Sequence, residues 1–121
     1  MVQLPRHTAH DEMPRISIHE LKELVDENAD VVILDAQQKK AYAQGHIHGA
    51  INFPWKQQIT PIDARFLPRD KPIVVYCDCG SKDTDSSEVA AQLAALGFED
   101  VRVLTDPSIK GWMEAGYPME P

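Results

Sequence analysis

The sequence predicts an α/β fold in which a parallel sheet is covered by helices on both faces. Short apolar, β-branched runs recur along the chain, at 31–35 (VVILD), 71–77 (KPIVVYC) and 100–104 (DVRVL). Runs that are apolar at consecutive positions are typical of strands buried on both faces. Segments with helical periodicity alternate with these runs, and this alternation indicates parallel strands joined by helical crossovers.

The amino-terminal segment and the first helix are predicted from capping residues and periodicity. Residues 1–14 are polar and show no period, so we expect a flexible arm followed by one domain at 15–121. Ser17 followed three positions later by Glu20 forms a capping box, the sign of a helix start. The apolar positions that follow lie on one helical face, and we expect this helix to end near Asn28.

The middle of the chain predicts a short helix, a small strand and an irregular segment. Residues 38–45 (QKKAYAQG) contain good helix formers and a closing glycine, which predicts one or two turns. Residues 46–54 (HIHGAINFP) are read as one small strand bounded by glycine and proline. Residues 56–70 contain Pro61 and Pro68 and are expected to be irregular.

Two further helices are predicted in the carboxyl-terminal half. Alanine and leucine recur at helical spacing over 86–96, and Gly97 follows where a helix would stop. Ser86 or Ser87 is expected to cap this helix. Residues 109–116 (IKGWMEAG) predict a short final helix.

Composition bounds the class of protein and its partners. A chain of 121 residues fits one domain, and its net charge of −7 argues against nucleic acid or an anionic membrane as partner. No apolar run approaches the roughly 18 residues that a membrane-spanning helix needs. The first residues do not have the pattern of a signal peptide. We therefore expect a soluble monomer, in the cytoplasm or the periplasm.

Cys77 lies where the active site of such a sheet is expected. It closes the apolar run 71–77, and the next predicted helix begins about nine residues later. In open α/β sheets the binding crevice lies beyond the carboxyl ends of the strands. The helix that follows directs unpaired N–H groups and the positive end of its dipole toward the intervening loop, and this environment favours a thiolate or a persulfide.

Six sequence blocks in order resemble the rhodanese (sulfurtransferase) family over residues 15–119. They are ISIHELKELV, VVILDAQ, GHIHGAINFP, KPIVVYC, SSEVAAQLAALGFEDVRVL and GWMEAGYP. The resemblance implies a rhodanese-like fold, a parallel five-stranded sheet flanked by helices, with Cys77 as the catalytic residue. It also implies that Cys77 takes a sulfane sulfur from a small donor or a persulfide carrier protein and passes it to a nucleophile. No metal or organic cofactor is expected.

The chain departs from the family pattern in four places. Residues 78–85 separate the cysteine from the serine after it, where the common loop has five residues, and Lys82 is the only cation among them. Gln37 replaces an arginine of the strand-end motif, residues 105–112 (TDPSIKGW) replace the usual glycine pair before tryptophan, and His48 replaces a common proline. The longer loop resembles a subset with the pattern YC-x-C followed by acidic and small residues.

The charges of the predicted active-site loop affect whether Cys77 is a thiolate. A carboxylate about 4 Å from the sulfur in water opposes the thiolate by about 1 kcal/mol, whereas a helix terminus stabilises it by roughly 0.3–2 kcal/mol. We expect the loop acids to face outward, with Lys82 and the loop amides near the sulfur. The acids should also disfavour thiosulfate and favour a neutral or cationic persulfide carrier. The predicted loop consists of Asp78, Cys79, Gly80, Ser81, Lys82, Asp83, Thr84, Asp85 and Ser86.

Other interpretations of the cysteines remain open. Cys77 can be an inert, buried side chain, and the domain can be a catalytically silent module that binds a partner protein or senses redox state through Cys77 and Cys79. Cys79 is either a resolving thiol or a filler that modulates the loop. A phosphatase or arsenate reductase of the related fold would need an arginine to clamp a tetrahedral oxyanion, and this loop has none.

The histidines with the cysteines, and Asp35, can each be interpreted as chemical or as structural residues. His46, His48 and the two cysteines could form a zinc ligand set, but the spacing matches no zinc finger, so we predict no metal. Asp35 ends its strand near the expected crevice, where it could act as an acid or base. Its structural role would be to hydrogen-bond the neighbouring loop backbone.

Overall fold

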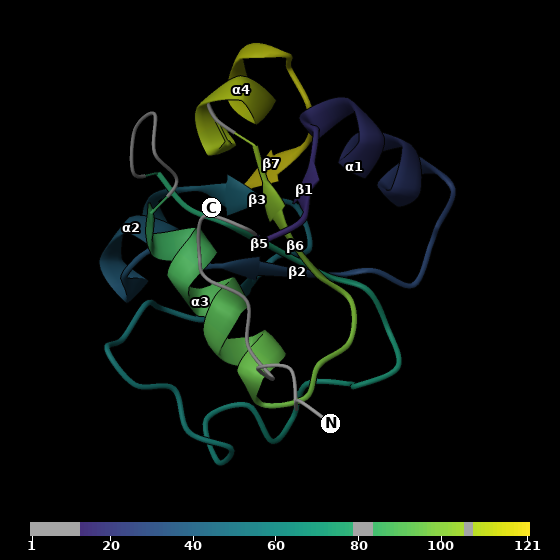
Figure 1. Ribbon diagram of the computed structural model, residues 1–121. Helices are drawn as coiled ribbons and strands as arrows, with labels where there is room; N and C mark the ends of the chain where they lie inside the picture. The colour runs from purple at the N-terminus through teal and green to yellow at the C-terminus, as the bar shows by residue number, and fades with distance from the viewer. Residues whose placement is uncertain (1–12, 79–83, 106–107) are drawn as a thin grey trace.

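The computed structural model describes residues 13–78, 84–105 and 108–121. Its centre is a five-stranded sheet in the order β1-β6-β5-β2-β4, with every adjacent pair parallel (Figure 1). The predicted α/β class and the parallel five-stranded sheet are confirmed. The strands are β1 (Arg15–Ile16), β2 (Val32–Asp35), β4 (Ile51–Asn52), β5 (Ile73–Tyr76) and β6 (Val101–Leu104).

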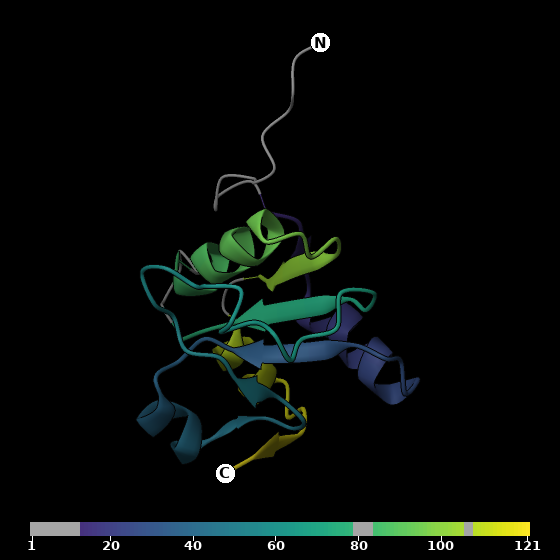
Figure 2. The same cartoon turned by 90° about the horizontal axis from the view of Figure 1, so that it is seen from below.

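Helices cover both faces of this sheet, as predicted. The side chains of β5 alternate: Ile73 and Val75 belong to the core under α3, whereas Val74 and Tyr76 belong to the core under α1 and α4. This alternation explains why the whole strand is apolar, because each face of the sheet packs against its own layer. Figure 2 shows β2, β5 and β6 side by side, with α3 next to β6. The helices are α1 (Ile18–Asp26), α2 (Lys39–Gln44), α3 (Thr84–Ala95) and α4 (Ile109–Glu114).

The capping box predicted at the start of α1 is present. The hydroxyl of Ser17 accepts from the backbone N–H of Glu20 at 3.0 Å, and the Glu20 carboxylate accepts from the backbone N–H of Ser17 at 2.9 Å. These two reciprocal bonds satisfy donors that the helix itself leaves unpaired. The helix ends at Asp26, two residues before Asn28, which has a positive φ of 58°.

The prediction of one strand over 46–54 is wrong. The segment contains two strands, β3 (His46–Ile47) and β4, which belong to different sheets. Gly49, with φ of 85°, lies between them at a backbone conformation that glycine adopts without strain. β3 instead pairs antiparallel with β7 (Met119–Glu120), a strand that the sequence analysis did not predict.

The start of α3 differs from the prediction at its serines. The helix begins at Thr84, so Ser86 and Ser87 lie within its first turn rather than at the cap. Both serines are fully buried. Their hydroxyls contact residues outside the helix, described below, and do not cap the helix. The prediction assumed that one of these serines was the cap, and it therefore placed the start of the helix two residues too late.

The packed region extends slightly beyond the predicted domain start at residue 15. Met13 is 5% exposed and belongs to the core under α3, and the carbonyl of Pro14 accepts from the N–H of Val103 at 2.8 Å. The rest of the predicted arm, residues 1–12, lies outside the described residues. In the part of the chain that the structure describes, no helix is long and apolar enough to cross a membrane.

Candidate active site

Cys77 is the first residue after β5, at the carboxyl edge of the parallel sheet. The fold therefore puts this cysteine where the sequence analysis expected it. The residue is 2% exposed, and its sulfur is disulfide-bonded. The structure thus represents an oxidised state of Cys77.

Ser86 in the first turn of α3 contacts the sulfur of Cys77. Oγ of Ser86 lies 3.3 Å from Sγ of Cys77, and both groups are buried. Because a disulfide sulfur carries no proton, the hydroxyl is the donor in this state. The first turn of α3 therefore faces the cysteine, although Ser86 is not the helix cap.

Ser108 is a second serine at this cysteine, and it was not among the predicted site residues. The backbone N–H of Cys77 donates to Oγ of Ser108 at 3.3 Å. Ser108 is 2% exposed and has a positive φ of 57°. Ser108 lies in the segment 105–112, which replaces the glycine pair that the family usually has before tryptophan. This replacement was the signal in the sequence that pointed to the position.

Arg15 is a cation near the site, and it was not among the predicted site residues either. Its Nη1 donates to Oγ of Ser87 at 3.0 Å, although the two residues are 72 positions apart in the chain. Arg15 lies on β1, level with Val103 of β6, and so reaches the first turn of α3 from the neighbouring part of the sheet. No local motif connects Arg15 to the loop, because only the strand order brings them together.

The acids of the predicted loop are described in part. Asp78 is exposed, and Thr84 and Asp85 begin α3. Burial raises the pKa of Asp85 above its ordinary value, and the negative charge of Glu88 raises it further. The other predicted loop residues lie outside the described residues: Cys79, Gly80, Ser81, Lys82 and Asp83.

Asp35 is fully buried at the end of β2 and accepts three hydrogen bonds. The donors are the Tyr76 hydroxyl at 2.5 Å, the Gln37 backbone N–H at 2.8 Å and the Gln37 side-chain amide at 3.0 Å. Burial, and then the bond to Asp35, raises the pKa of Tyr76 well above its ordinary range. Tyr76 also accepts from the N–H of Ile47 at 3.0 Å. The contacts match the structural reading of Asp35, since it holds the chain that leaves β2.

A cavity of about 410 Å³ lies where the chain leaves β4. Trp55 in its wall donates from Nε1 to the Glu88 carboxylate of α3 at 2.7 Å, which ties the irregular segment to that helix. Gln92 of α3 adds two bonds to the same segment, accepting from Ile59 N–H at 2.6 Å and donating to the Lys56 carbonyl at 3.1 Å. The cavity is lined by Gln38, Phe53, Pro54, Trp55, Lys56 and Asp63.

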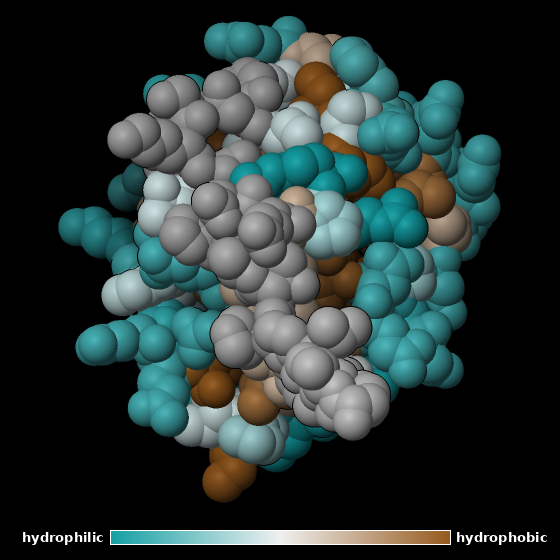
Figure 3. Space-filling model, in the orientation of Figure 1, coloured by the Kyte–Doolittle hydropathy of each residue, from teal (hydrophilic) through white to brown (hydrophobic). Residues whose placement is uncertain are grey.

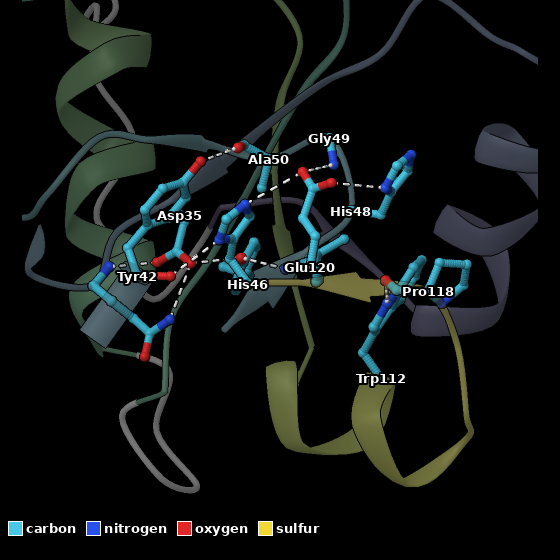
Figure 4. Close-up of polar contacts among 12 residues, drawn as sticks. Asp35, Tyr42, His46, His48, Gly49, Ala50, Trp112, Pro118 and Glu120 are labelled. Atoms are coloured by element: carbon cyan, nitrogen blue, oxygen red, sulfur yellow. Dashed lines mark hydrogen bonds and ion pairs between the residues drawn. The ribbon is translucent and has the colours of Figure 1, made fainter. Parts of the chain in front are cut away.

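The two histidines considered as zinc ligands contact one carboxylate instead. His46 Nε2 lies 3.3 Å and His48 Nδ1 2.9 Å from the Glu120 carboxylate, which also accepts from Gly49 N–H at 3.0 Å (Figure 4). These contacts hold β7 beside β3. Among the described residues, no group of three or more His, Cys, Asp or Glu side chains is arranged to hold a metal ion.

Comparison with known proteins identifies a family and two named relatives. A family model described as the rhodanese-like domain matches residues 17–115. The thiosulfate sulfurtransferase PspE of Escherichia coli is 27% identical over 81 residues, which cover 64% of this chain and 78% of that protein. A sulfurtransferase of Allochromatium vinosum is 28% identical over 104 residues, which cover 86% of this chain and 92% of that protein.

Solved structures show the same fold. The BH2092 protein of Bacillus halodurans superimposes with a TM-score of 0.81 at 26% identity, covering 89% of this chain and 77% of that chain. The rhodanese-like domain of the Anabaena Alr3790 protein superimposes with a TM-score of 0.75 at 29% identity, covering 88% of this chain and 78% of that chain.

Proposed function

Because this chain belongs to the rhodanese-like domain family, we propose that it is a sulfurtransferase whose nucleophile is Cys77. The observation that carries the proposal is the position of Cys77, which follows β5 and contacts Ser86 in the first turn of α3 at 3.3 Å. A hydrogen bond from a hydroxyl to a thiolate or persulfide anion stabilises the charged form. The relatives named as sulfurtransferases support the same chemistry.

The reaction consists of two displacements at sulfur. The Cys77 thiolate attacks the sulfane sulfur of a persulfide donor R–S–SH, the donor S–S bond breaks, and R–S⁻ leaves with the bonding pair. Cys77 then holds the transferred atom as a persulfide. An acceptor thiolate attacks the outer sulfur, which restores the Cys77 thiolate without net oxidation or reduction.

We propose a neutral or cationic persulfide carrier as donor rather than thiosulfate. Asp78 is exposed beside Cys77, Asp85 and Glu88 follow on the first turns of α3, and the net charge of the chain is −7. These charges repel a dianion that approaches the site. The relative PspE is named a thiosulfate sulfurtransferase. For this chain, we infer the donor from the charges around Cys77.

The test is sulfur loading followed by intact-mass spectrometry. The protein is reduced, the reductant is removed, and a sulfane donor is added; we expect a gain of one sulfur atom. Cys77→Ser should abolish this gain, whereas the matched variant Cys79→Ser should retain it. Reduction must also make Cys77 available to a small alkylating agent, since the residue is 2% exposed in the disulfide-bonded state. Reduced protein that gains no sulfur from any donor would contradict the proposal.

A second candidate function is redox sensing by a catalytically silent module. The observation that favours it is the disulfide at Cys77. A sensor would gain no sulfur in the loading experiment, but it would cycle between dithiol and disulfide when the ratio of oxidised to reduced glutathione is varied. Sulfur gain at Cys77 decides for the transferase.

A further inference from the structure

Ser108, immediately before α4, has a backbone conformation that serine rarely adopts. Its φ of 57° and ψ of −124° are those of the first central residue of a type II′ turn. Glycine, asparagine and aspartate dominate that position because a Cβ atom clashes there. A serine at this point therefore stores strain that a glycine would not.

The surrounding structure holds Ser108 in this conformation from both sides. The Ser108 N–H donates to the Thr105 carbonyl at 2.7 Å, and the Ser108 carbonyl accepts from Trp112 N–H at 3.1 Å. Trp112 is itself buried, and its indole N–H donates to the Pro118 carbonyl at 2.8 Å (Figure 4). The end of β6 and the anchored helix α4 together fix the strained residue.

The side chain of Ser108 has a use that glycine could not serve. The pairing of β5 with β6 ends at Val75 and Val103, two residues before Cys77, so the N–H of Cys77 lies beyond the paired residues. Oγ of Ser108 accepts this buried N–H instead, at 3.3 Å. Buried amides need an acceptor, and glycine would fit the backbone without supplying one.

We propose that Ser108 is a positioning residue that fixes how Cys77 leaves β5 and so keeps its sulfur against the Ser86 hydroxyl. Strained residues persist where the structure over-determines them, and they cluster at functional sites. Two serines hold Cys77. The Ser86 hydroxyl contacts its sulfur, and the Ser108 hydroxyl accepts from its main-chain N–H. This inference rests on the proposed role of Cys77 as nucleophile, but it is tested on Cys77 reactivity itself.

The experiment compares Ser108→Gly with Ser108→Ala in the reduced protein. Both variants lack the hydroxyl, and Ser108→Ala alone keeps the strain. We expect Ser108→Gly to melt at least about 4 °C above Ser108→Ala. All proteins carry Cys79→Ser, so that Cys77 is the one thiol alkylated by iodoacetamide.

We expect both Ser108 variants to lower the alkylation rate of Cys77 at neutral pH by about tenfold, through a pKa about one unit higher. The cause is the loss of the Ser86 hydrogen bond when the Cys77 main chain shifts. In a Ser86→Ala background, Ser108→Gly should have little further effect, because the bond it maintains is already absent.

Asn28→Gly is the matched control. Asn28 also has a positive φ, 58°, but is exposed at the end of α1. This change should relieve strain and leave the alkylation profile of Cys77 unchanged.

Two results would overturn the inference. One is an alkylation profile of Ser108→Gly equal to that of the reference protein. The other is an alkylation rate that follows melting temperature, with Ser108→Ala slower than Ser108→Gly, which is the signature of a merely structural residue. If the reference protein takes up no sulfur while the Ser108 variants still alter alkylation, the proposed function fails and this inference stands.

Discussion

At the scale of single residues, the buried pair of Tyr76 and Asp35 shows how the strand ends are tied together. The Tyr76 hydroxyl donates to Asp35 at 2.5 Å and accepts from Ile47 N–H at 3.0 Å, so one oxygen joins β5, β2 and β3. Gln37 supplies the other two donors to Asp35, at the position where the family pattern has arginine. The carboxylate is thus held by neutral groups.

Tyr76→Phe should destabilise the fold by about 1–3 kcal/mol, because it leaves a buried N–H and a buried carboxylate oxygen without their hydroxyl partner. The free energy of unfolding from urea titration measures the loss. Tyr117→Phe is the matched control: its hydroxyl contacts Nδ1 of His19 at 2.7 Å at the surface, and we expect a change within about 0.5 kcal/mol. Equal losses of unfolding free energy in the two variants would show that the buried hydroxyl of Tyr76 stabilises the fold no more than the surface hydroxyl of Tyr117.

At the scale of elements, one carboxylate adds side-chain contacts to the backbone pairing of β7 with β3. Glu120 accepts from Gly49 N–H at 3.0 Å and contacts His46 and His48 (Figure 4). The Gly49 bond lowers the pKa of Glu120 below its ordinary value of 4.5, and the charge of His48 and the hydrogen bonds to His46 and His48 lower it further. Folding therefore favours the ionised form of Glu120.

The pH dependence of stability follows from that direction. Because the folded pKa lies below the unfolded value of 4.5, Glu120 contributes stability above pH 4.5, and this contribution is lost as the pH falls through the folded pKa. Glu120→Gln should therefore reduce the loss of stability on acidification, measured as the melting temperature between about pH 3 and pH 6. Glu114→Gln, an exposed carboxylate on α4, should keep the wild-type slope. If the melting temperature of Glu120→Gln falls with pH as steeply as that of the wild type, Glu120 is not the source of the pH dependence.

At the scale of the whole molecule, negative charge dominates. The chain has 19 acidic and 12 basic residues, for a net charge of −7. The face shown in Figure 3 is largely hydrophilic around its rim. A field of one sign over the surface changes the rate at which charged ligands arrive, and salt screens it.

Salt should therefore separate two classes of donor. Raising KCl to about 0.3 M should speed sulfur loading from dianionic thiosulfate by roughly threefold or more, since screening weakens the repulsion. Loading from cysteamine persulfide, which also carries an ammonium group, should change little. The initial rate of sulfur gain at Cys77 is the measurement, with Cys77→Ser as the blank. A thiosulfate rate that falls with salt would mean that a local cation, such as Arg15, governs the approach of the donor.

The sequence by itself determined the elements whose signals are local. The apolar runs of β2, β5 and β6 predicted a parallel sheet, and the capping box at Ser17 predicted the start of α1, because burial on two faces and helix capping each depend on a few neighbouring residues. The same reasoning put Cys77 at the edge of the sheet. These are the features that the structure confirms.

The tertiary structure alone decided which distant residues surround Cys77. Ser108 reaches its N–H from 31 positions away, and Arg15 reaches Ser87 from 72 positions away. The pairing of β3 with β7 likewise joins segments far apart in the chain. Such contacts depend on the order of strands in the sheet and on which helix covers which face, and no local propensity of the sequence encodes either.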